Sequence, residues 1–173
     1  AMGGNFKTAR NRIQAPVQRL EKSHRKLEVH LDELAAAVAG VAASKGKSEV
    51  HWDKIDELVA YFQRSVLRHE QDEEDSVFPR LAEHPALRSL ITRLTGDHQS
   101  QRKLVAALAE LCASPSRSTA AAIARLGRIS KEFKTSLLDH IAREDRELLP
   151  ALSRHVSASE QAAIAIEMAD RRG

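Results

Sequence analysis

Residues 62–81 read FQRSVLRHEQDEEDSVFPRL, and residues 133–152 read FKTSLLDHIAREDRELLPAL. A shift of 71 places superimposes the second segment on the first without a gap and leaves seven positions identical. The identities include the histidine, the glutamate and the proline of each copy, which are His69, Glu73 and Pro79, then His140, Glu144 and Pro150. The chain therefore contains an internal repeat centred on a histidine and a glutamate four positions apart.

Apolar residues on both sides of this repeat recur at steps of three and four, which is the period of one buried helix face. Four such stripes cover residues 13–41, 55–77, 87–108 and 126–148. Polar stretches that contain glycine or proline separate them. Because long helices with short connections run antiparallel to their neighbours, the sequence predicts an all-α fold, an up-down-up-down four-helix bundle.

The C-terminal end carries a separate helix signal. Ser157 and Glu160 form a capping-box pattern ahead of Ile164, which predicts a short fifth helix. A chain of 173 residues is long enough for one domain with a substantial core and too short for two ordinary ones. We therefore expect residues 13–173 to form one domain, preceded by a flexible segment at residues 1–12.

Composition excludes several classes of protein. The net charge is only +3 and the two signs are interspersed, so no basic surface for nucleic acid is predicted. No apolar run is long enough to cross a membrane, and no secretory signal is evident. Cys112 is the only cysteine, which excludes an internal disulfide framework and fits a reducing cytoplasm.

Six polar side chains occupy positions that the stripes assign to the interior, namely His24, His69, Glu73, His98, His140 and Glu144. Burying such groups without partners costs several kcal/mol each. Residues four apart lie on one helix face, so each helical hairpin directs a histidine and a His-x-x-x-Glu pair at the core. In a closed bundle each of two metal ions then takes two imidazoles, and each glutamate bridges both ions. Mixed imidazole and carboxylate donors suit iron, with zinc or manganese as substitutes.

The run from His69 to Leu81 and its echo from His140 to Leu152 resemble the signature of the hemerythrin-like (HHE) cation-binding family, and the resemblance covers roughly residues 12–155. Members use histidines and glutamates in this order as ligands of a di-iron centre, which implies that role for the six residues above. Invertebrate oxygen carriers have a further histidine where this chain has Arg102, and an aspartate where it has Glu144. The chain is closer to the bacterial four-histidine type and is similar to the di-iron domain of iron–sulfur cluster repair proteins.

We therefore expect a cytoplasmic non-haem di-iron protein that binds or senses O2, NO or peroxide. Two alternatives stay open, an enzyme that acts on peroxide or nitric oxide and an iron donor for cluster repair. The sequence identifies no catalytic residue and no protein partner. A ferritin-like site would require Glu-x-x-His on two helices, whereas only Glu21 with His24 matches that order.

The remaining histidines and glutamates near the motifs are not assigned as metal ligands. Four histidines fall off the stripes or in turns and are expected at the surface, namely His30, His51, His84 and His155. Glu70 follows His69, but its repeat counterpart is Ile141, so we leave it out of the ligand set. Glu28 lies one turn after His24, where it is either a flank charge or a group that orients the histidine.

Overall fold

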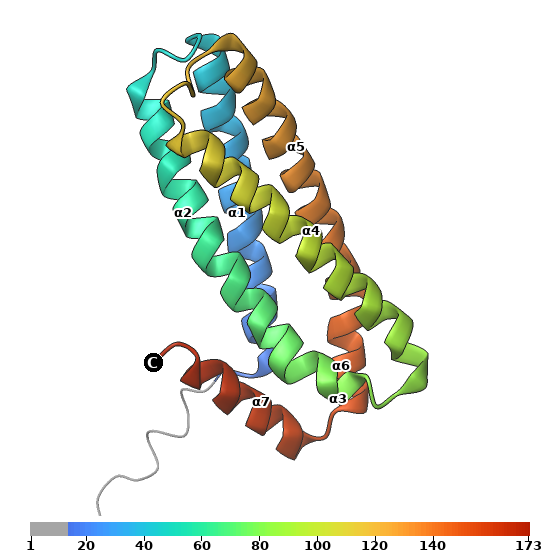
Figure 1. The fold of residues 1–173 in the computed structure, drawn as a ribbon. Coiled ribbons are helices and arrows are strands. Elements are labelled where there is room, and N and C mark those ends of the chain that lie inside the picture. Colours follow the sequence, from blue (N-terminus) through green and yellow to red (C-terminus); the bar gives the residue numbers. More distant parts are fainter. Residues whose placement is uncertain (1–13) are drawn as a thin grey trace, which may run out of the picture.

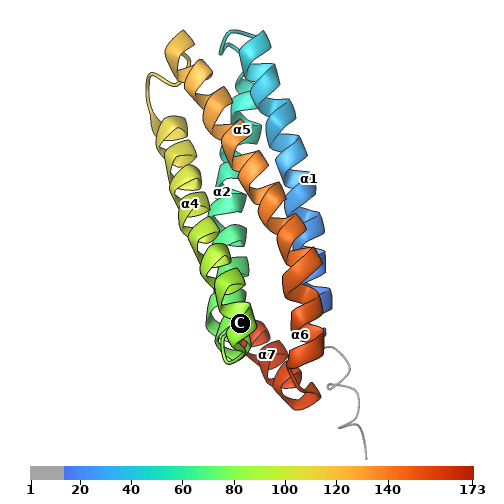
Figure 2. The same cartoon turned by 90° about the vertical axis from the view of Figure 1, so that its right-hand side faces the viewer.

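Four long helices lie side by side in the computed structural model, which describes residues 14–173 (Figure 1). They are α1 (Pro16–Ala43), α2 (Glu49–Asp72), α4 (Arg88–Ala113) and α5 (Ala120–Arg143). Around the bundle α1 contacts α2, α2 contacts α4, α4 contacts α5, and α5 contacts α1, an arrangement that Figure 2 shows from a second side. The predicted helical bundle is confirmed. The flexible segment expected at residues 1–12 lies outside the described residues, as does Ile13.

Helices α2 and α5 both end in a π-helical turn that leads into a short further helix. These turns are η2 (Glu73–Val77) and η4 (Glu144–Leu148), followed by α3 (Phe78–Leu81) and α6 (Leu149–His155). The backbone N–H of Phe78 bonds to the carbonyl of Glu73, five residues back. Pro79 then stands in the first turn of α3, where its missing N–H costs no hydrogen bond. Each helical path therefore continues for a short stretch beyond its proline.

At one end of the bundle, side-chain contacts join the connection between α1 and α2 to the connection between α4 and α5. Gly46 adopts a φ of 77° in the turn between α1 and α2, a conformation that glycine takes without steric cost. The indole of Trp52 donates a hydrogen bond to the carbonyl of Gly46 at 3.1 Å. Arg117, from the connection between α4 and α5, covers the Trp52 ring at 4.6 Å and pairs with Asp56 at 2.9 Å. The contacts of Trp52 and Arg117 therefore stabilise this end of the bundle.

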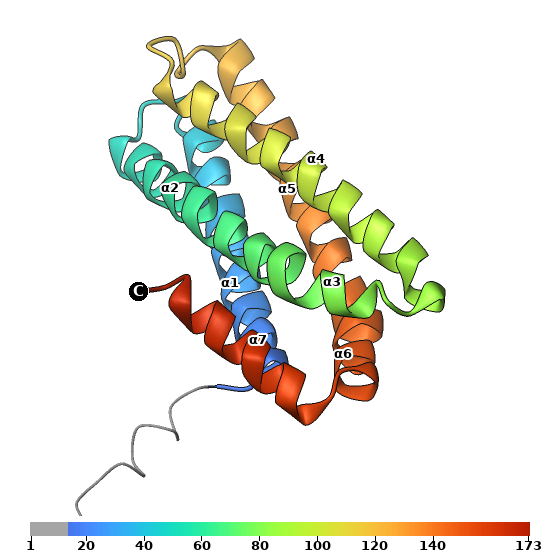
Figure 3. The ribbon, with the colours of Figure 1, turned by 60° about the horizontal axis from the view of Figure 1, so that its bottom comes forward.

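Helix α7 (Ala158–Asp170) packs across the opposite end of the bundle, as Figure 3 shows. Ser157 accepts a hydrogen bond from the backbone N–H of Glu160, whose carboxylate accepts one from the backbone N–H of Ser157. This capping box was the sequence signal for a fifth helix, which is thereby confirmed. Arg171 ties the end of α7 to Asp72 of α2 at 3.0 Å.

The apolar core has two parts with a polar layer between them. One cluster centres on Phe62 and Phe133, whose rings meet edge to face at 5.1 Å. The other lies toward α7 and includes Leu94 and Met168. Along each long helix, the polar interior residues come between members of the first cluster and members of the second. The polar layer is thus closed above and below by packed hydrocarbon. None of the described helices combines the length and apolar character needed to cross a membrane.

Candidate metal centre

All six polar residues predicted for the interior come together in this layer. The long helices each supply a histidine, and the two π turns each supply the glutamate at their first position: His24 from α1, His69 from α2, Glu73 from η2, His98 from α4, His140 from α5 and Glu144 from η4. Each side chain is buried, and the most exposed of them, His69, is only 4% exposed. The six groups therefore share one interior space.

Their donor atoms form two groups that could each hold a metal ion. One group contains His24 and His69, the other contains His98 and His140, and both contain Glu73 and Glu144. Within each group the donor atoms lie no more than 4.8 Å apart. The His24 and His69 rings are 4.9 Å apart at 67°, and the His98 and His140 rings are 4.8 Å apart at 64°. The two halves of the cluster are thus closely similar in geometry, as the sequence repeat implies.

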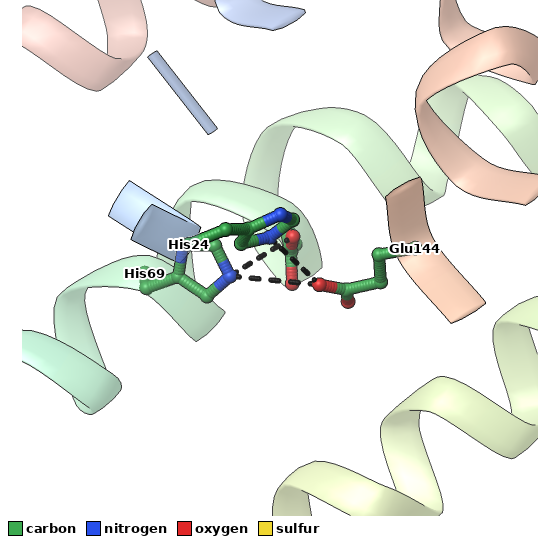
Figure 4. Close-up of side chains that lie close together, drawn as sticks. His24, His69 and Glu144 are labelled. Atoms are coloured by element: carbon green, nitrogen blue, oxygen red, sulfur yellow. Dashed lines mark ion pairs between the residues drawn. The ribbon is translucent and has the colours of Figure 1, made fainter. Parts of the chain in front are cut away.

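The two glutamates face both halves at once. Glu73 places Oε1 at 3.3 Å from Nε2 of His69 and Oε2 at 3.2 Å from Nε2 of His98. Glu144 places Oε2 at 3.0 Å from Nε2 of His24 and Oε1 at 2.7 Å from Nε2 of His140. Figure 4 shows the imidazoles of His24 and His69 directed at the carboxylate of Glu144. Each carboxylate therefore offers one oxygen to each histidine pair, which is the arrangement of a bridging ligand.

Several of these atoms make no well-directed hydrogen bond within the described part of the chain, although they lie within ion-pair distance of one another. They are Nε2 of His24, both ring nitrogens of His69, and all four carboxylate oxygens of Glu73 and Glu144. Buried polar atoms normally make hydrogen bonds, so a concentration of buried nitrogens and oxygens without them needs an explanation. Imidazole nitrogens and carboxylate oxygens are ligands for iron, zinc and manganese. The residues present therefore fit a metal ion at each group.

The electrostatic environment of the cluster also favours positive charge. Burial lowers the pKa of His69, but Glu73 and Glu144 outweigh it and raise that pKa to about 9. Burial likewise opposes charge on His98, whereas Glu144 and Glu73 raise its pKa to about 11. Burial favours neutral Glu144, yet the imidazoles that face it hold its pKa well below its usual range. Buried carboxylates thus draw cations to this space, either protons on the imidazoles or metal ions between them.

The model of the hemerythrin HHE cation-binding domain matches residues 15–152 of the chain. The chain belongs to this family. The match spans the four long helices and both π turns, and therefore includes all six residues of the cluster. No curated protein matches the sequence. Membership of the HHE family and the buried histidine and glutamate groups together support a metal-binding function.

In this HHE domain three of the four histidines are held from outside the cluster by a carboxylate. Nδ1 of His24 contacts Asp145 at 2.6 Å, and Nδ1 of His98 contacts Glu74 at 2.8 Å. Asp145 and Glu74 are repeat counterparts, so each π turn supports the histidine of the opposite hairpin. Such contacts fix the ring orientation and the tautomer of a histidine whose other nitrogen binds a metal.

The third supported histidine is His140. Its Nδ1 lies 3.2 Å from Asp97, the residue before His98. Each outer carboxylate is in turn paired with an arginine: Asp145 with Arg25, Glu74 with Arg102, and Asp97 with Arg143. The cluster is therefore surrounded by carboxylate and arginine pairs, which sequence reasoning did not identify. Their signal was weak because the positions look like ordinary flank charges.

The other polar candidates take no part in the two donor groups. Glu70 is buried and pairs with Arg102 at 2.5 Å. The guanidinium of Arg102 contacts both Glu70 and Glu74. Glu28 contacts Arg25 at 3.1 Å, and Asp145 instead of Glu28 contacts His24. The histidines predicted for the surface also lie outside both groups, and the rings of His84 and His155 lie 4.5 Å apart, tilted by 44°.

Proposed function

We propose that the six side chains hold two iron ions bridged by Glu73 and Glu144, and that the centre binds or senses O2, NO or peroxide. The observation that carries this proposal is the division of donor atoms into two groups that share both glutamates. A single mononuclear site would need one such group. Two groups with a common pair of carboxylates favour a dinuclear centre, and its mixed nitrogen and oxygen donors suit iron.

The protein's own residues hold the ligands in place before any metal binds. His24 and His98 are fixed by Asp145 and Glu74, and the ring of Phe78 stacks on His98 at a centroid distance of 5.7 Å. Apolar clusters pack above and below the six side chains. Bound iron would supply reversible redox chemistry and open coordination positions for a small ligand.

Spectroscopy of the iron-loaded protein tests this function. We expect protein from iron-supplemented cells, reduced anaerobically with dithionite, to change its near-ultraviolet and visible absorption when O2, NO or peroxide is added. The change should saturate at about one ligand per pair of ions, while zinc-loaded protein stays unchanged because zinc has no redox chemistry. A flat spectrum with iron fully loaded would contradict the proposal. Turnover of peroxide or nitric oxide well beyond that stoichiometry would favour an enzyme.

The support of His24 by Asp145 gives a further prediction. Asp145→Asn removes the charge that orients the imidazole and increases its basicity, so metal affinity should fall about 10- to 100-fold. Glu147→Gln is the matched control, because Glu147 lies on the same π turn but pairs with Arg146 at the surface. Competition with a chromophoric chelator measures the metal affinity of both variants. Equal affinity in the two would refute the orienting role of Asp145.

A further inference from the structure

His69 is the one histidine of the cluster whose outer nitrogen contacts no carboxylate among the described residues. Its Nε2 faces Glu73 and Glu144, whereas Nδ1, on the other side of the ring, has no hydrogen-bond partner there (Figure 4). Its counterpart in the other half, His140, has Asp97 at this nitrogen. Asp97 directly precedes His98, and the residue that directly precedes His24 is Ser23. The second half of the cluster thus has a carboxylate where the first half has a serine.

A cavity of about 350 Å³ lies beside His69 and Ser23. Its lining includes five basic side chains, and no aspartate or glutamate: Arg19, Lys22, Lys26, Arg68 and Arg172. Among the described residues only Arg172 of these makes an ion pair, with Asp72. The undescribed residues 1–13 contain no aspartate or glutamate that could pair with the other four. Positive charge is therefore concentrated at the nitrogen that lacks a carboxylate.

Arg19 is a cavity residue that is affected by a basic neighbour. Its Nε is buried without a hydrogen-bond partner in the described chain. Burial and the nearby charge of Arg172 lower the pKa of Arg19. Arg19 and His69 both line this basic cavity, and each has a buried nitrogen, Nε of Arg19 and Nδ1 of His69, without a hydrogen-bond partner in the described chain. Both are hydrogen-bond donors when His69 carries its proton on Nδ1, and a small anion with several acceptor oxygens satisfies such donors.

We propose that this cavity binds a small oxyanion, which accepts a hydrogen bond from Nδ1 of His69 in the place that Asp97 takes at His140. The anion completes the set of outer partners and orients His69 as the carboxylates orient the other three histidines. Its effect on the metal centre rests on the function proposed above, whereas the cavity and its charges do not. The ligand class is set by acceptor oxygens and negative charge, which inorganic phosphate, sulfate and formate share.

Calorimetric titration of the zinc-loaded full chain with inorganic phosphate tests the proposal, and sulfate and formate serve as competing anions. We expect saturable binding of one phosphate per chain. Ser23→Asp places a carboxylate beside His69 and should weaken phosphate binding at least about tenfold through repulsion and occupation of the site. Ser23→Asn has nearly the same shape without the charge and should bind phosphate within about threefold of the original chain.

Charge variants distinguish this site from general attraction of anions. Lys22→Gln or Arg68→Gln should each weaken phosphate binding about three- to tenfold. Lys131→Gln is the control, because Lys131 is an exposed lysine of α5 outside the cavity. Equal binding by Ser23→Asp and Ser23→Asn, non-saturable binding, or equal losses in Lys22→Gln and Lys131→Gln would each overturn the proposal.

Metal content measured on the same samples separates this inference from the proposed function. Ser23→Asp should retain its metal while it loses phosphate, because the new carboxylate orients His69 as Asp97 orients His140. A chain that binds phosphate through Lys22 and Arg68 but takes up no metal would refute the dinuclear centre alone. A chain that holds two metal ions but binds no phosphate would refute the oxyanion site alone.

Discussion

We expect Glu144→Gln to remove nearly all bound metal, with an affinity loss of more than about 100-fold, beyond the range seen for outer partners of metal ligands. The carboxylate of Glu144 faces all four imidazoles, and its two oxygens serve both donor groups. An amide has no negative charge and only one acceptor oxygen, so it cannot bridge two cations as a carboxylate does. Metal content by plasma emission spectroscopy measures the loss.

The variant should remain folded, because the substitution preserves the shape of a side chain that lies between two packed apolar clusters. Circular dichroism checks this. His69→Ala should lose metal in the same way, and His155→Ala should not, because His155 is exposed and lies outside both donor groups. If His69→Ala, His155→Ala and Glu144→Gln all retained metal equally, the ligand assignment would be wrong.

Removal of metal from the unaltered chain should lower its melting temperature by on the order of 10 °C. Free metal at about 1,000 times its Kd stabilises a native state that alone binds it by about 4 kcal/mol. A domain of this size changes its melting temperature by about 2 to 4 °C for each kcal/mol. Scanning calorimetry of the metal-loaded protein and of protein dialysed against a chelator measures the difference.

Glu144→Gln supplies the control for this experiment, since a chain that binds little metal should melt at nearly the same temperature with and without chelator. Similar melting temperatures for the loaded and the stripped unaltered protein, with metal loss verified, would show that the cluster does not depend on a cation.

Much of the fold and the cluster could be predicted, because both follow from the spacing of residues along helices. The apolar stripes place the histidines and glutamates inside, and the repeat pairs His69 and Glu73 with His140 and Glu144. The capping box at Ser157 similarly identifies the start of α7 from local residues alone. These features depend on residues a few positions apart, whose relation a helix fixes in advance.

The π turns and the outer carboxylates could not be predicted in the same way. Proline signals a missing N–H, but whether the helix stops or takes a wider turn depends on packing against other helices. Asp145 and Glu74 reach histidines of the opposite hairpin, across a contact between segments far apart in the sequence. Asp97 is indistinguishable in sequence from an exposed helix charge, and only the closed bundle shows that it reaches His140.

The unequal surroundings of His69 and His140 affect the order in which the two donor groups would bind metal ions. His98 and His140 are both oriented by carboxylates, whereas of His24 and His69 only His24 is. The half that contains His98 and His140 is therefore better preorganised to retain a cation. For the proposed dinuclear centre we therefore expect stepwise occupancy as metal becomes available, with the half beside the basic cavity the last to load and the first to empty.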